Sequence, residues 1–451
     1  MRIKFLGGTS TVTGSKFLVT DRKTSLLVDC GLFQGLKEWR LRNREPFPVE
    51  PGSVDAVVLT HAHLDHAGYL PLFVKNGFSG PVFATSGTLQ LCSILLPDSG
   101  RIQEEDARYA NKKGFSKHVP AEPLYTERDA ETSLRQIEPL PFAVPFRQGD
   151  IEAILRPAGH ILGAAMVELT GSGETVIFSG DLGRDDDLLM SPPSSGLGGD
   201  WIVVESTYGD RVHPSQDHLE KLAHLIRSTI EKGGAVLIPA FAVGRAQALI
   251  YSVYLLKKEG RVPDIPLFLD SPMATNVLNL YGAHVGEHRL SKAECDALTS
   301  AATLVTTVSQ SKALSVSSEP RIIISASGMA TGGRVLHHLR ALAGNRRNTI
   351  VFAGYQAEGT RGAAIVSGAS SVRIHGSEVS IGAQVEILEQ FSAHADSDAV
   401  LAWLSGLSKK PKGVFVVHGE RSASEVLRAR IQEELGLKAT VPDYLDEVDL
   451  T

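Results

Sequence analysis

Cysteine, long apolar runs and an excess of either charge are all scarce in this chain. Its 451 residues include only three cysteines, and such an odd, widely spaced set makes neither a disulfide framework nor a zinc knuckle. The longest apolar candidate, Ala235–Val243, is far shorter than the roughly 20 residues of a membrane span. The first residues run straight into strand-like sequence and lack the apolar core of a signal peptide. We therefore expect a cytoplasmic protein without a membrane partner.

The charge balance excludes one class of nucleic-acid-binding protein. With 45 Lys and Arg against 51 Asp and Glu, the formal net charge is −6. This mild acidity argues against a protein that coats DNA through nonspecific electrostatic attraction. It does not exclude a nucleic-acid enzyme, because a bound metal would change the local field. The length suggests two or three domains.

What the chain does contain is a set of short apolar runs that each stop at a polar residue. Runs this short are typical of strands that are buried on both faces. In layered α/β folds, sites are built at the carboxyl ends of such strands. Four of these runs suggest one convergent site, although strands end at polar residues in any case. The runs are Val54–Leu59 before His61, Thr175–Ser179 before Asp181, Trp201–Val204 before Glu205, and Gly413–Val417 before His418.

After Tyr208 the sequence changes to a regular alternation of strand-like and helix-like segments. This pattern indicates a domain with a parallel sheet. Segments that resemble the strand ends of the first part then return around His394 and His418. We therefore expect one domain to be inserted into another. The expected helices include Ala246–Lys258 and Ser422–Leu435.

The segment Thr60–Gly68, which reads THAHLDHAG, concentrates metal-binding side chains. Its four candidates are His61, His63, Asp65 and His66, and imidazole and carboxylate are good ligands for zinc and similar ions. Four ligands in one short loop are too many for a single tetrahedral zinc with an open position, so two neighbouring metals explain the crowding better. His160 would complete a three-histidine site and Asp181 would bridge two ions. Taken alone, each of these two is equally well read as a core histidine or a strand-end cap.

The order of motifs resembles a known family. The motifs LLVDCGLFQG, THAHLDH, PAGHILGAA and SGDLG resemble the successive metal motifs of the metallo-β-lactamase superfamily. The later motifs VVESTYGDR, FSAHAD and VVHGE are similar to motifs A, B and C of its β-CASP branch, the nucleic-acid-processing nucleases. Together with ISASGMATGGR and AFAVGRAQ, they resemble bacterial ribonucleases that are similar to the 73-kDa subunit of the cleavage and polyadenylation specificity factor.

This resemblance covers nearly the whole chain and implies its architecture. We expect an α/β fold, with a four-layered αββα metallo-β-lactamase domain and an inserted parallel-sheet β-CASP domain. The expected boundaries are 1–208 and 391–451 for the first domain and 209–390 for the insertion.

The resemblance also implies roles for the site residues. One zinc would be held by His61, His63 and His160, and a second by Asp65, His66 and His418. Asp181 would bridge the pair, and Asp29 would orient ligands without contacting the metal. Glu205 would orient His394, which is the candidate general acid for the leaving 3′-oxygen.

A zinc-dependent ribonuclease acting on single-stranded RNA is the function these roles imply, with hydroxide attack supported by two metals. The sequence leaves open whether it acts as an endonuclease, a 5′ exonuclease or both, and whether it is a homo-oligomer. A DNA nuclease is disfavoured by His418, because DNA-repair members of the branch typically have Val there. A non-catalytic RNA-binding scaffold is disfavoured because every ligand position is filled. Hydrolysis of small esters or lactams is disfavoured by the inserted domain and the Glu205–His394 pair.

Phosphate binding is expected from the inserted domain. Small residues after a buried strand let backbone N–H groups approach a phosphate, although a packing turn is an equal alternative. Arg245 reaches either a phosphate or an acidic side chain. Tyr208 either stacks on a base or belongs to the core. The remaining candidates are Ser325, Ser327, Gly328, Met329, Gly332, Gly333 and Arg334.

Overall fold

The chain divides into two compact units in the computed structural model. The structure describes residues 1–114, 118–214, 218–354, 356, 359–388 and 391–450, apart from the side chain of His218. Unit 1 consists of Met1–Val212 and His394–Thr451, and unit 2 of His213–Ala393. The domain boundaries expected from the sequence stay predictions, and residue 390, on which one of them falls, lies outside the described residues. No helix in the described ranges combines the length and apolar character needed to cross a bilayer.

Unit 1 contains two sheets of seven strands each. The first has the order β22 (Glu447–Asp449), β1 (Arg2–Phe5), β2 (Phe17–Asp21), β3 (Thr24–Val28), β4 (Ala56–Val58), β5 (Val82–Ala84) and β6 (Ile137–Pro139). The second has the order β21 (Ala439–Thr440), β20 (Gly413–Val417), β11 (Trp201–Glu205), β10 (Glu174–Phe178), β9 (Ala165–Gly171), β8 (Ile151–Pro157) and β7 (Phe146–Gln148).

The core of unit 1 lies between these two sheets. Aromatic rings from opposite sheets meet there: the ring centroids of Phe5 and Phe415 are 5.3 Å apart, and those of Phe17 and Phe178 are 5.7 Å apart. Burial of these apolar faces supplies the main driving force for the packing of sheet on sheet.

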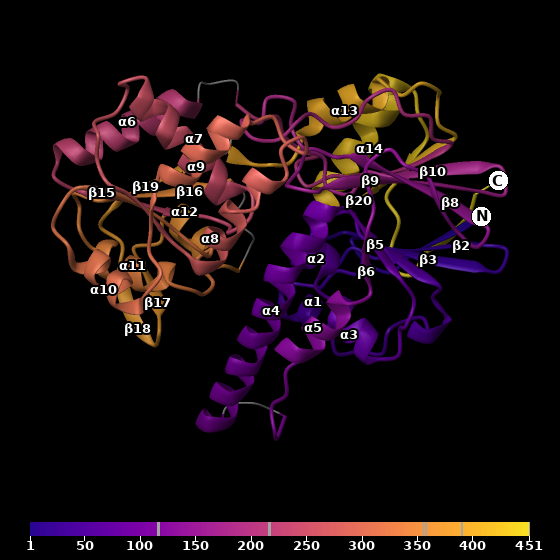
Figure 1. Cartoon of the computed structure of the whole chain (residues 1–451), viewed down its shortest axis with the longest axis horizontal. Coiled ribbons are helices and arrows are strands. Elements are labelled where there is room, and N and C mark those ends of the chain that lie inside the picture. Colours follow the sequence, from indigo (N-terminus) through magenta and orange to yellow (C-terminus); the bar gives the residue numbers. More distant parts are fainter. Residues whose placement is uncertain (115–117, 215–217, 355, 357–358, 389–390, 451) are drawn as a thin grey trace. The chain divides into compact units, whose positions relative to one another are not determined.

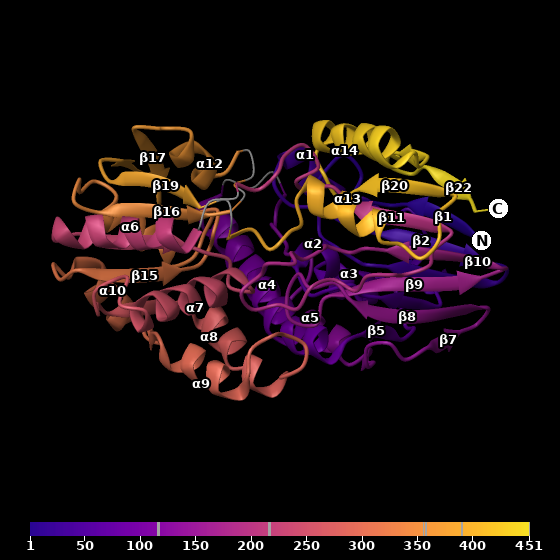
Figure 2. The ribbon, with the colours of Figure 1, turned by 90° about the horizontal axis from the view of Figure 1, so that it is seen from above.

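Helices cover the outer faces, as Figures 1 and 2 show. They are α1 (Lys37–Arg42), α2 (Leu64–Ala67), α3 (Leu70–Lys75), α4 (Ser86–Lys113), α5 (Glu127–Leu134), α13 (Ser397–Ser405) and α14 (Arg421–Leu435), with a 3₁₀ turn at Pro51–Ser53. The four-layered αββα arrangement is confirmed, and the predicted helix Ser422–Leu435 corresponds to α14.

Unit 2 is built on a six-stranded sheet in which every described pairing is parallel. Ile322, Ile323 and Ile324 of its inner strand β15 are fully buried. The sheet order is β14 (Thr303–Leu304), β13 (Leu267–Asp270), β15 (Arg321–Ser325), β12 (Ala235–Pro239), β16 (Thr349–Ala353) and β19 (Gln384–Leu388), beside a hairpin of β17 (Ser371–Ile374) and β18 (Ser377–Ser380). The parallel sheet expected for the insertion is confirmed.

The helices of unit 2 alternate with these strands. They are α6 (His218–Glu231), α7 (Arg245–Lys258), α8 (Pro272–Leu278), α9 (Lys292–Ser300), α10 (Val308–Val316), α11 (Val335–Leu342) and α12 (Arg361–Val366), with a 3₁₀ turn at Tyr281–Ala283. The predicted helix Ala246–Lys258 corresponds to α7.

Parallel pairing in unit 1 aligns the strand ends that carry polar residues. In the second sheet, Phe178 pairs with Val203, and Glu205 with Val417. In the first sheet, Val28 pairs with Val58. The residues that follow these strands therefore emerge at matched heights along each sheet edge.

Candidate metal centre

The segment that carries His61, His63 and His66 follows the C-terminal end of β4, in the first sheet of unit 1. His61 lies in the extended segment after β4, and His63 is the N-cap residue of α2. Asp65 and His66 lie on α2 itself. This change from extended chain to helix separates the four side chains into two groups, as the crowding of the motif led us to expect.

Three imidazole nitrogens converge in the first group. His63 Nδ1 lies 3.1 Å from His61 Nε2 and 3.2 Å from His160 Nε2. Ligand nitrogens around a tetrahedral zinc, at 2.0–2.1 Å from the ion, are about 3.3 Å apart. His160, which follows β8, therefore completes a set of donors whose spacing fits such an ion.

The second group joins residues that are distant in sequence. His66 Nε2 lies 3.2 Å from His418 Nε2, and His418 Nε2 lies 3.5 Å from Asp65 Oδ2. His418 follows β20 of the second sheet and has a left-handed backbone conformation, with φ of 48°. The site is thus shared between the two sheets.

Asp181, which follows β10, reaches both groups with one carboxylate. Its Oδ2 is 3.5 Å from both His61 Nε2 and His160 Nε2, and its Oδ1 is 3.2 Å from His66 Nε2. Oδ1 is buried, and no hydrogen bond of good geometry reaches it from the described residues. A buried carboxylate oxygen without a hydrogen bond is costly, and a cation at each group would satisfy it.

The protonation states also suit metal binding. Burial lowers the pKa of His61 and lowers that of His63 to about 4. Burial opposes ionisation of Asp65, but the hydrogen bond from His418 and the charge of His66 lower its pKa to about 2. Neutral imidazole and ionised carboxylate are the forms that bind metal.

His66 is the exception in the second group. Burial alone would lower its pKa, but Asp181 and Asp29 raise it well above its usual value. Binding of an ion at this group would therefore displace a proton from His66.

Asp29 holds the metal loop without being in either group. Its Oδ2 is 2.7 Å from His66 Nδ1, and its Oδ1 accepts a hydrogen bond of 2.7 Å from the backbone N–H of Thr60. A carboxylate behind a ligating histidine fixes the ring orientation and tautomer. The structure places Asp29 next to His66, and the role of orienting a metal ligand stays a prediction for it.

Glu205 and His394 form a pair beside Asp181. His394 Nδ1 lies 3.0 Å from Glu205 Oε2, and Glu205 Oε1 also accepts a 2.6 Å hydrogen bond from the backbone N–H of Leu182. Glu205 is buried, whereas 16% of the His394 side chain is exposed. Glu205 also lies close enough to Asp181 and His418 to form a third group of potential ligands, but its oxygens already accept these hydrogen bonds.

Comparison with protein families identifies these motifs. The metallo-β-lactamase superfamily matches residues 12–81, the Beta-Casp domain 246–365, and the Zn-dependent metallo-hydrolase RNA specificity domain 378–442. Ribonuclease TTHA0252 of Thermus thermophilus is 39% identical over 93% of both chains. This chain belongs to the β-CASP branch of the metallo-β-lactamase superfamily. The resemblance drawn from the motifs is confirmed, and the chain is an RNA-acting metallo-hydrolase.

More distant members of the family and its fold are also found. Transcription termination factor FttA is 31% identical in Methanocaldococcus jannaschii and 32% in Pyrococcus abyssi. The alignments span 99% and 100% of this chain and 71% of each FttA. A crystal structure of an Enterococcus faecalis V583 protein of unknown function shares the fold, with a TM-score of 0.57 and 15% identity over 100% of this chain and 99% of that one.

Two threonines of this β-CASP protein support the metal centre and were missed by sequence reasoning. Thr60 Oγ1 is 2.9 Å from Asp29 Oδ2 and 3.1 Å from His61 Nδ1. Thr207 Oγ1 lies 3.2 Å from His418 Nδ1. Each threonine lies two residues beyond the end of a buried strand and close in sequence to a predicted site residue, and this position is the sequence signal that could have identified it.

The glycine-rich loop of unit 2 is explained partly by packing. A Cβ at Gly328 would lie 2.9 Å from the backbone N of Phe241, and one at Gly333 would lie 2.7 Å from the carbonyl oxygen of Ala326. Gly332 has open space around it. Ser327 Oγ accepts a 3.1 Å hydrogen bond from Thr331 N, and the backbone oxygen of Met329 accepts one of 2.9 Å from Gly362 N. Phosphate binding by this loop stays a prediction.

The other predicted phosphate ligands have structural partners. Arg334 donates to Asp270 Oδ1 at 2.6 Å and to the carbonyl oxygen of Val305 at 3.0 Å. The fully buried Ser325 donates to the carbonyl oxygen of Asp270 at 2.9 Å. Arg245 donates to the carbonyl oxygen of Ala353 at 2.6 Å. These contacts favour a structural role for the three side chains, although this partner of Arg245 is a carbonyl oxygen and not the acidic side chain expected as its alternative. Phosphate binding by these residues stays a prediction.

Tyr208 lies in unit 1 near the metal centre. Only 4% of it is exposed, and its ring centroid is 6.2 Å from that of His394. This burial favours the core-tyrosine alternative over base stacking, which stays a prediction.

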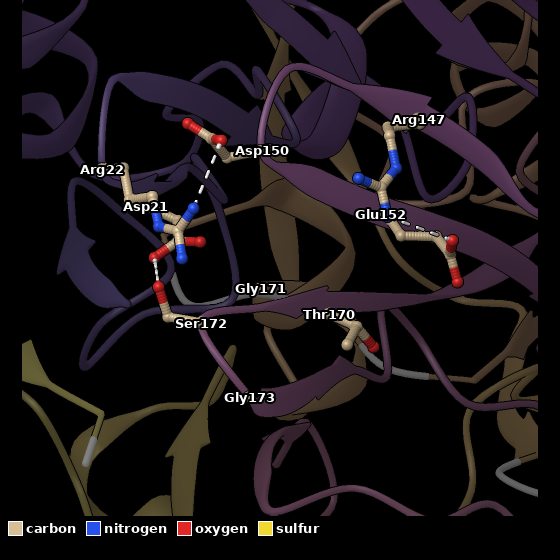
Figure 3. Close-up of a pocket in the computed structure, with 9 residues that line it drawn as sticks. All are labelled: Asp21, Arg22, Arg147, Asp150, Glu152, Thr170, Gly171, Ser172 and Gly173. Carbon is tan, nitrogen blue, oxygen red and sulfur yellow. Dashed lines mark hydrogen bonds and ion pairs between the residues drawn. The ribbon is translucent and has the colours of Figure 1, made fainter.

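A pocket at the opposite ends of the strands contains none of the predicted site residues. It has a volume of about 300 Å³ and is lined at the β2–β3, β7–β8 and β9–β10 turns (Figure 3). Ion pairs cross it between Arg22 and Asp150 at 3.9 Å and between Arg147 and Glu152 at 3.7 Å. We therefore place the candidate active site at the other ends of the strands, where the predicted metal ligands lie, and not in this pocket.

Proposed function

We propose that the protein is a zinc-dependent ribonuclease that binds two Zn²⁺ and hydrolyses phosphodiester bonds in single-stranded RNA. The observation that carries the proposal is the double ligand set joined by Asp181, with the Glu205–His394 pair beside it. The names of the relatives support RNA as the substrate, because one is a ribonuclease and others are transcription termination factors. A cytoplasmic location and action as a homo-oligomer stay predictions.

The zinc donors divide between the two ions. His61, His63 and His160 would hold the first, Asp65, His66 and His418 would hold the second, and Asp181 would be shared between them. When bound, such a pair of ions supplies an activated water and positive charge for the phosphoryl oxygens. Asp29 keeps the ring of His66 in place for this task.

His394 is the group that we propose to protonate the leaving 3′-oxygen. Its Nδ1 faces Glu205, so the proton for transfer would be carried by Nε2 on the opposite side of the ring. The buried Glu205 carboxylate stabilises the imidazolium form and fixes the ring orientation. A positioned general acid of this kind contributes roughly 10²- to 10⁴-fold to the rate.

RNA is favoured over DNA by the histidine at motif C. His418 supplies a ring nitrogen to the second group, where the DNA-repair members of the branch typically have Val. Internal cleavage is our first expectation, with 5′ exonuclease action as a second mode.

The deciding experiment is a cleavage assay on zinc-loaded protein. Matched single-stranded RNA and DNA are supplied with free or blocked 5′ ends, and bound zinc is counted by elemental analysis. We expect cleavage of RNA only, internal cuts on blocked ends, and two zinc ions per chain.

The variant His394→Ala is the matched control within this assay. It should keep both zinc ions and lose about 10²- to 10⁴-fold of the rate, because its side chain lies outside both ligand groups. Loss of zinc together with activity would contradict the acid role. Two bound zinc ions without cleavage of either nucleic acid by the wild-type protein would refute the nuclease itself.

A further inference from the structure

Helix α1 of unit 1 buries none of its residues. A six-residue helix gains too little from its own hydrogen bonds to be stable in isolation, and this one has no apolar face in the core. Leu36 and Leu41 are 43% and 47% exposed. The helix therefore contributes little apolar burial to the stability of the unit. Core packing does not explain why this exposed segment forms a helix.

The helix is nevertheless held in place at its C-terminal end, by Arg42 and by the C-cap residue Asn43. Asn43 accepts a hydrogen bond of 3.0 Å from the backbone N of Phe33 and donates one of 2.7 Å to its carbonyl oxygen. The guanidinium of Arg42 lies 4.4 Å from the ring centroid of Trp39 and 4.3 Å from that of Tyr444. Contacts of this kind between a guanidinium and aromatic rings are favourable. The helix is thus fixed to the surface of the unit.

The positive charges on this segment are concentrated and partly unpaired. Between Lys37 and Arg44 there are four basic residues and one acidic residue, in a chain whose net charge is −6. Arg42 is used in the ring contacts, and Arg44 donates to the carbonyl oxygen of Glu122 at 2.8 Å. Lys37 and Arg40 are exposed, and neither forms an ion pair or side-chain hydrogen bond with the residues that the structure describes.

The segment is joined directly to the metal loop. Between Asp29 and α1, the backbone N of Cys30 donates to the carbonyl oxygen of His66 at 2.7 Å, and that of Leu32 donates to Leu64 at 2.8 Å. Lys37 is five residues beyond Leu32, so the chain between them spans at most about 18 Å. The positive side chains are therefore within a few nucleotides of the metal centre.

We propose that α1 binds the single-stranded RNA that leads to the metal centre, with Lys37 and Arg40 contacting its phosphates. We call Leu36, Lys37, Arg40, Leu41 and Arg44 the α1 patch. The inference rests on the proposed ribonuclease function and adds a binding surface outside the metal centre. Charge complementarity selects the occupant, because exposed cations next to aromatic side chains are the usual means of following a nucleic-acid strand.

The test compares two double variants. Lys37→Gln with Arg40→Gln removes the two unpaired cations of the α1 patch. Arg22→Gln with Arg147→Gln removes two exposed cations at the opposite strand ends (Figure 3). Binding of a fluorescent 20-nucleotide RNA is measured on zinc-loaded protein in the His394→Ala background, over a range of salt concentrations. Cleavage of this RNA and of a dinucleotide is measured with proteins that keep His394.

We expect the α1 double variant to bind the RNA about tenfold more weakly or worse at 0.1 M salt. The slope of log K against log salt should fall by about 1.4, because each phosphate contact on a single strand contributes about 0.7. Its KM for the long RNA should rise about tenfold more than its KM for the dinucleotide, which is too short to reach α1. The Arg22 and Arg147 double variant should match its parent in each measurement.

Equal affinity and equal salt slope in the α1 double variant would overturn the inference and would favour a protein partner for the α1 patch. Failure of the ribonuclease proposal would give a different result in these assays. In that case the unsubstituted protein would bind RNA in a Lys37- and Arg40-dependent manner and cleave none of it. The fluorescence of Trp39 gives a local check, since RNA should change the emission of the parent protein and not that of the Trp39→Phe variant.

Discussion

At the scale of single residues, Lys16 is a buried lysine whose surroundings change its pKa. Only 2% of Lys16 is exposed, and its Nζ lies 4.2 Å from the ring centroid of Phe33 and 4.9 Å from that of Tyr69. It donates one hydrogen bond of 3.3 Å to the carbonyl oxygen of Gly14. Burial lowers the pKa of Lys16 to about 7. The cost of removing the ammonium group from water therefore exceeds the stabilisation of its charged form by the two rings and the carbonyl oxygen.

This lysine predicts a pH dependence of stability. In the unfolded chain a lysine has a pKa of about 10.4, so between pH 7 and pH 10 the unfolded state holds one more proton than the folded state. The free energy of unfolding therefore rises with pH in that window, by about 1.4 kcal/mol per pH unit from this group. The contribution is constant below the folded pKa. Lys16→Met should remove it, so that between pH 7 and 9 the wild type gains about 2–3 kcal/mol relative to the variant.

Denaturant unfolding at a series of pH values checks this expectation. Lys23→Met, at an exposed lysine in the β2–β3 turn, is the matched control and should follow the wild type. Parallel curves for wild type and Lys16→Met would show that Lys16 holds its proton in both states.

At the scale of elements, the metal loop depends on how closely two segments approach. Gly31 packs against the backbone of α2: a Cβ there would lie 1.7 Å from the carbonyl oxygen of Asp65. That same oxygen accepts a hydrogen bond of 2.9 Å from the backbone N of Ser15. Three segments thus meet behind Asp65, a predicted metal ligand, and the closeness of these contacts leaves none of them room to shift alone.

Gly31→Ala should therefore damage the second group of ligands. We expect a loss of about 1–3 kcal/mol in the free energy of unfolding, the usual cost of overpacking. Metal affinity should fall about 10- to 100-fold, as it does when the supports of a ligand are disturbed. Titration of metal-free protein with zinc measures the second effect. Gly52→Ala is the control, because a Cβ there meets its nearest neighbour at 3.6 Å.

The elements of the fold were predictable to different degrees. Val54–Leu59, Thr175–Ser179 and Gly413–Val417 were predictable as buried strands because they are short, apolar and bounded by polar residues. They coincide within two residues with β4, β10 and β20 of unit 1. Helix α1 was not, since its six residues show no apolar face and its position depends on Asn43 and Tyr444. The spacing of apolar residues shows which face of a segment is buried. It therefore cannot predict a helix such as α1, which buries none of its residues.

The candidate site shows the same division. The spacing of His61, His63, Asp65 and His66 indicated two metals by itself, because the motif is local. The polar strand ends suggested that His418 belongs to the same site, but only the family resemblance placed His418, 352 positions away, in one ligand set with His66. The contact of Thr207 with His418 came from neither, since it depends on how β11 and β20 pair.

On the scale of the whole molecule, the two ligand groups join the two sheets of unit 1. Four of the predicted ligands follow β4 in the first sheet, and the other three, His160, Asp181 and His418, follow strands of the second. Neither of these groups contains a residue of unit 2. Each unit has its own hydrophobic core. Ions bound by these groups would therefore stabilise unit 1 by linking its sheets at the edge where buried Asp181 has an oxygen without a hydrogen bond from the described residues.

Removal of metal should accordingly affect one unit and spare the other. A ligand at 100 times its Kd stabilises the folded state by about 2.7 kcal/mol, and for domains of this size each kcal/mol corresponds to about 2–4 °C in Tm. Calorimetry of zinc-loaded and chelated protein should show two transitions. Chelation should lower the transition of unit 1 by about 5–10 °C and leave that of unit 2 in place.

The assignment of the transitions needs a matched variant in each unit. Val203→Ala in the core of unit 1 and Ile323→Ala in the core of unit 2 each remove a buried side chain, which lowers the Tm of the unit that contains it. The transition shifted by Val203→Ala should be the one that responds to chelation. If the transition shifted by Ile323→Ala moved equally with zinc, the metal would be stabilising unit 2 as well, and the location of its ligands in unit 1 would not account for its effect.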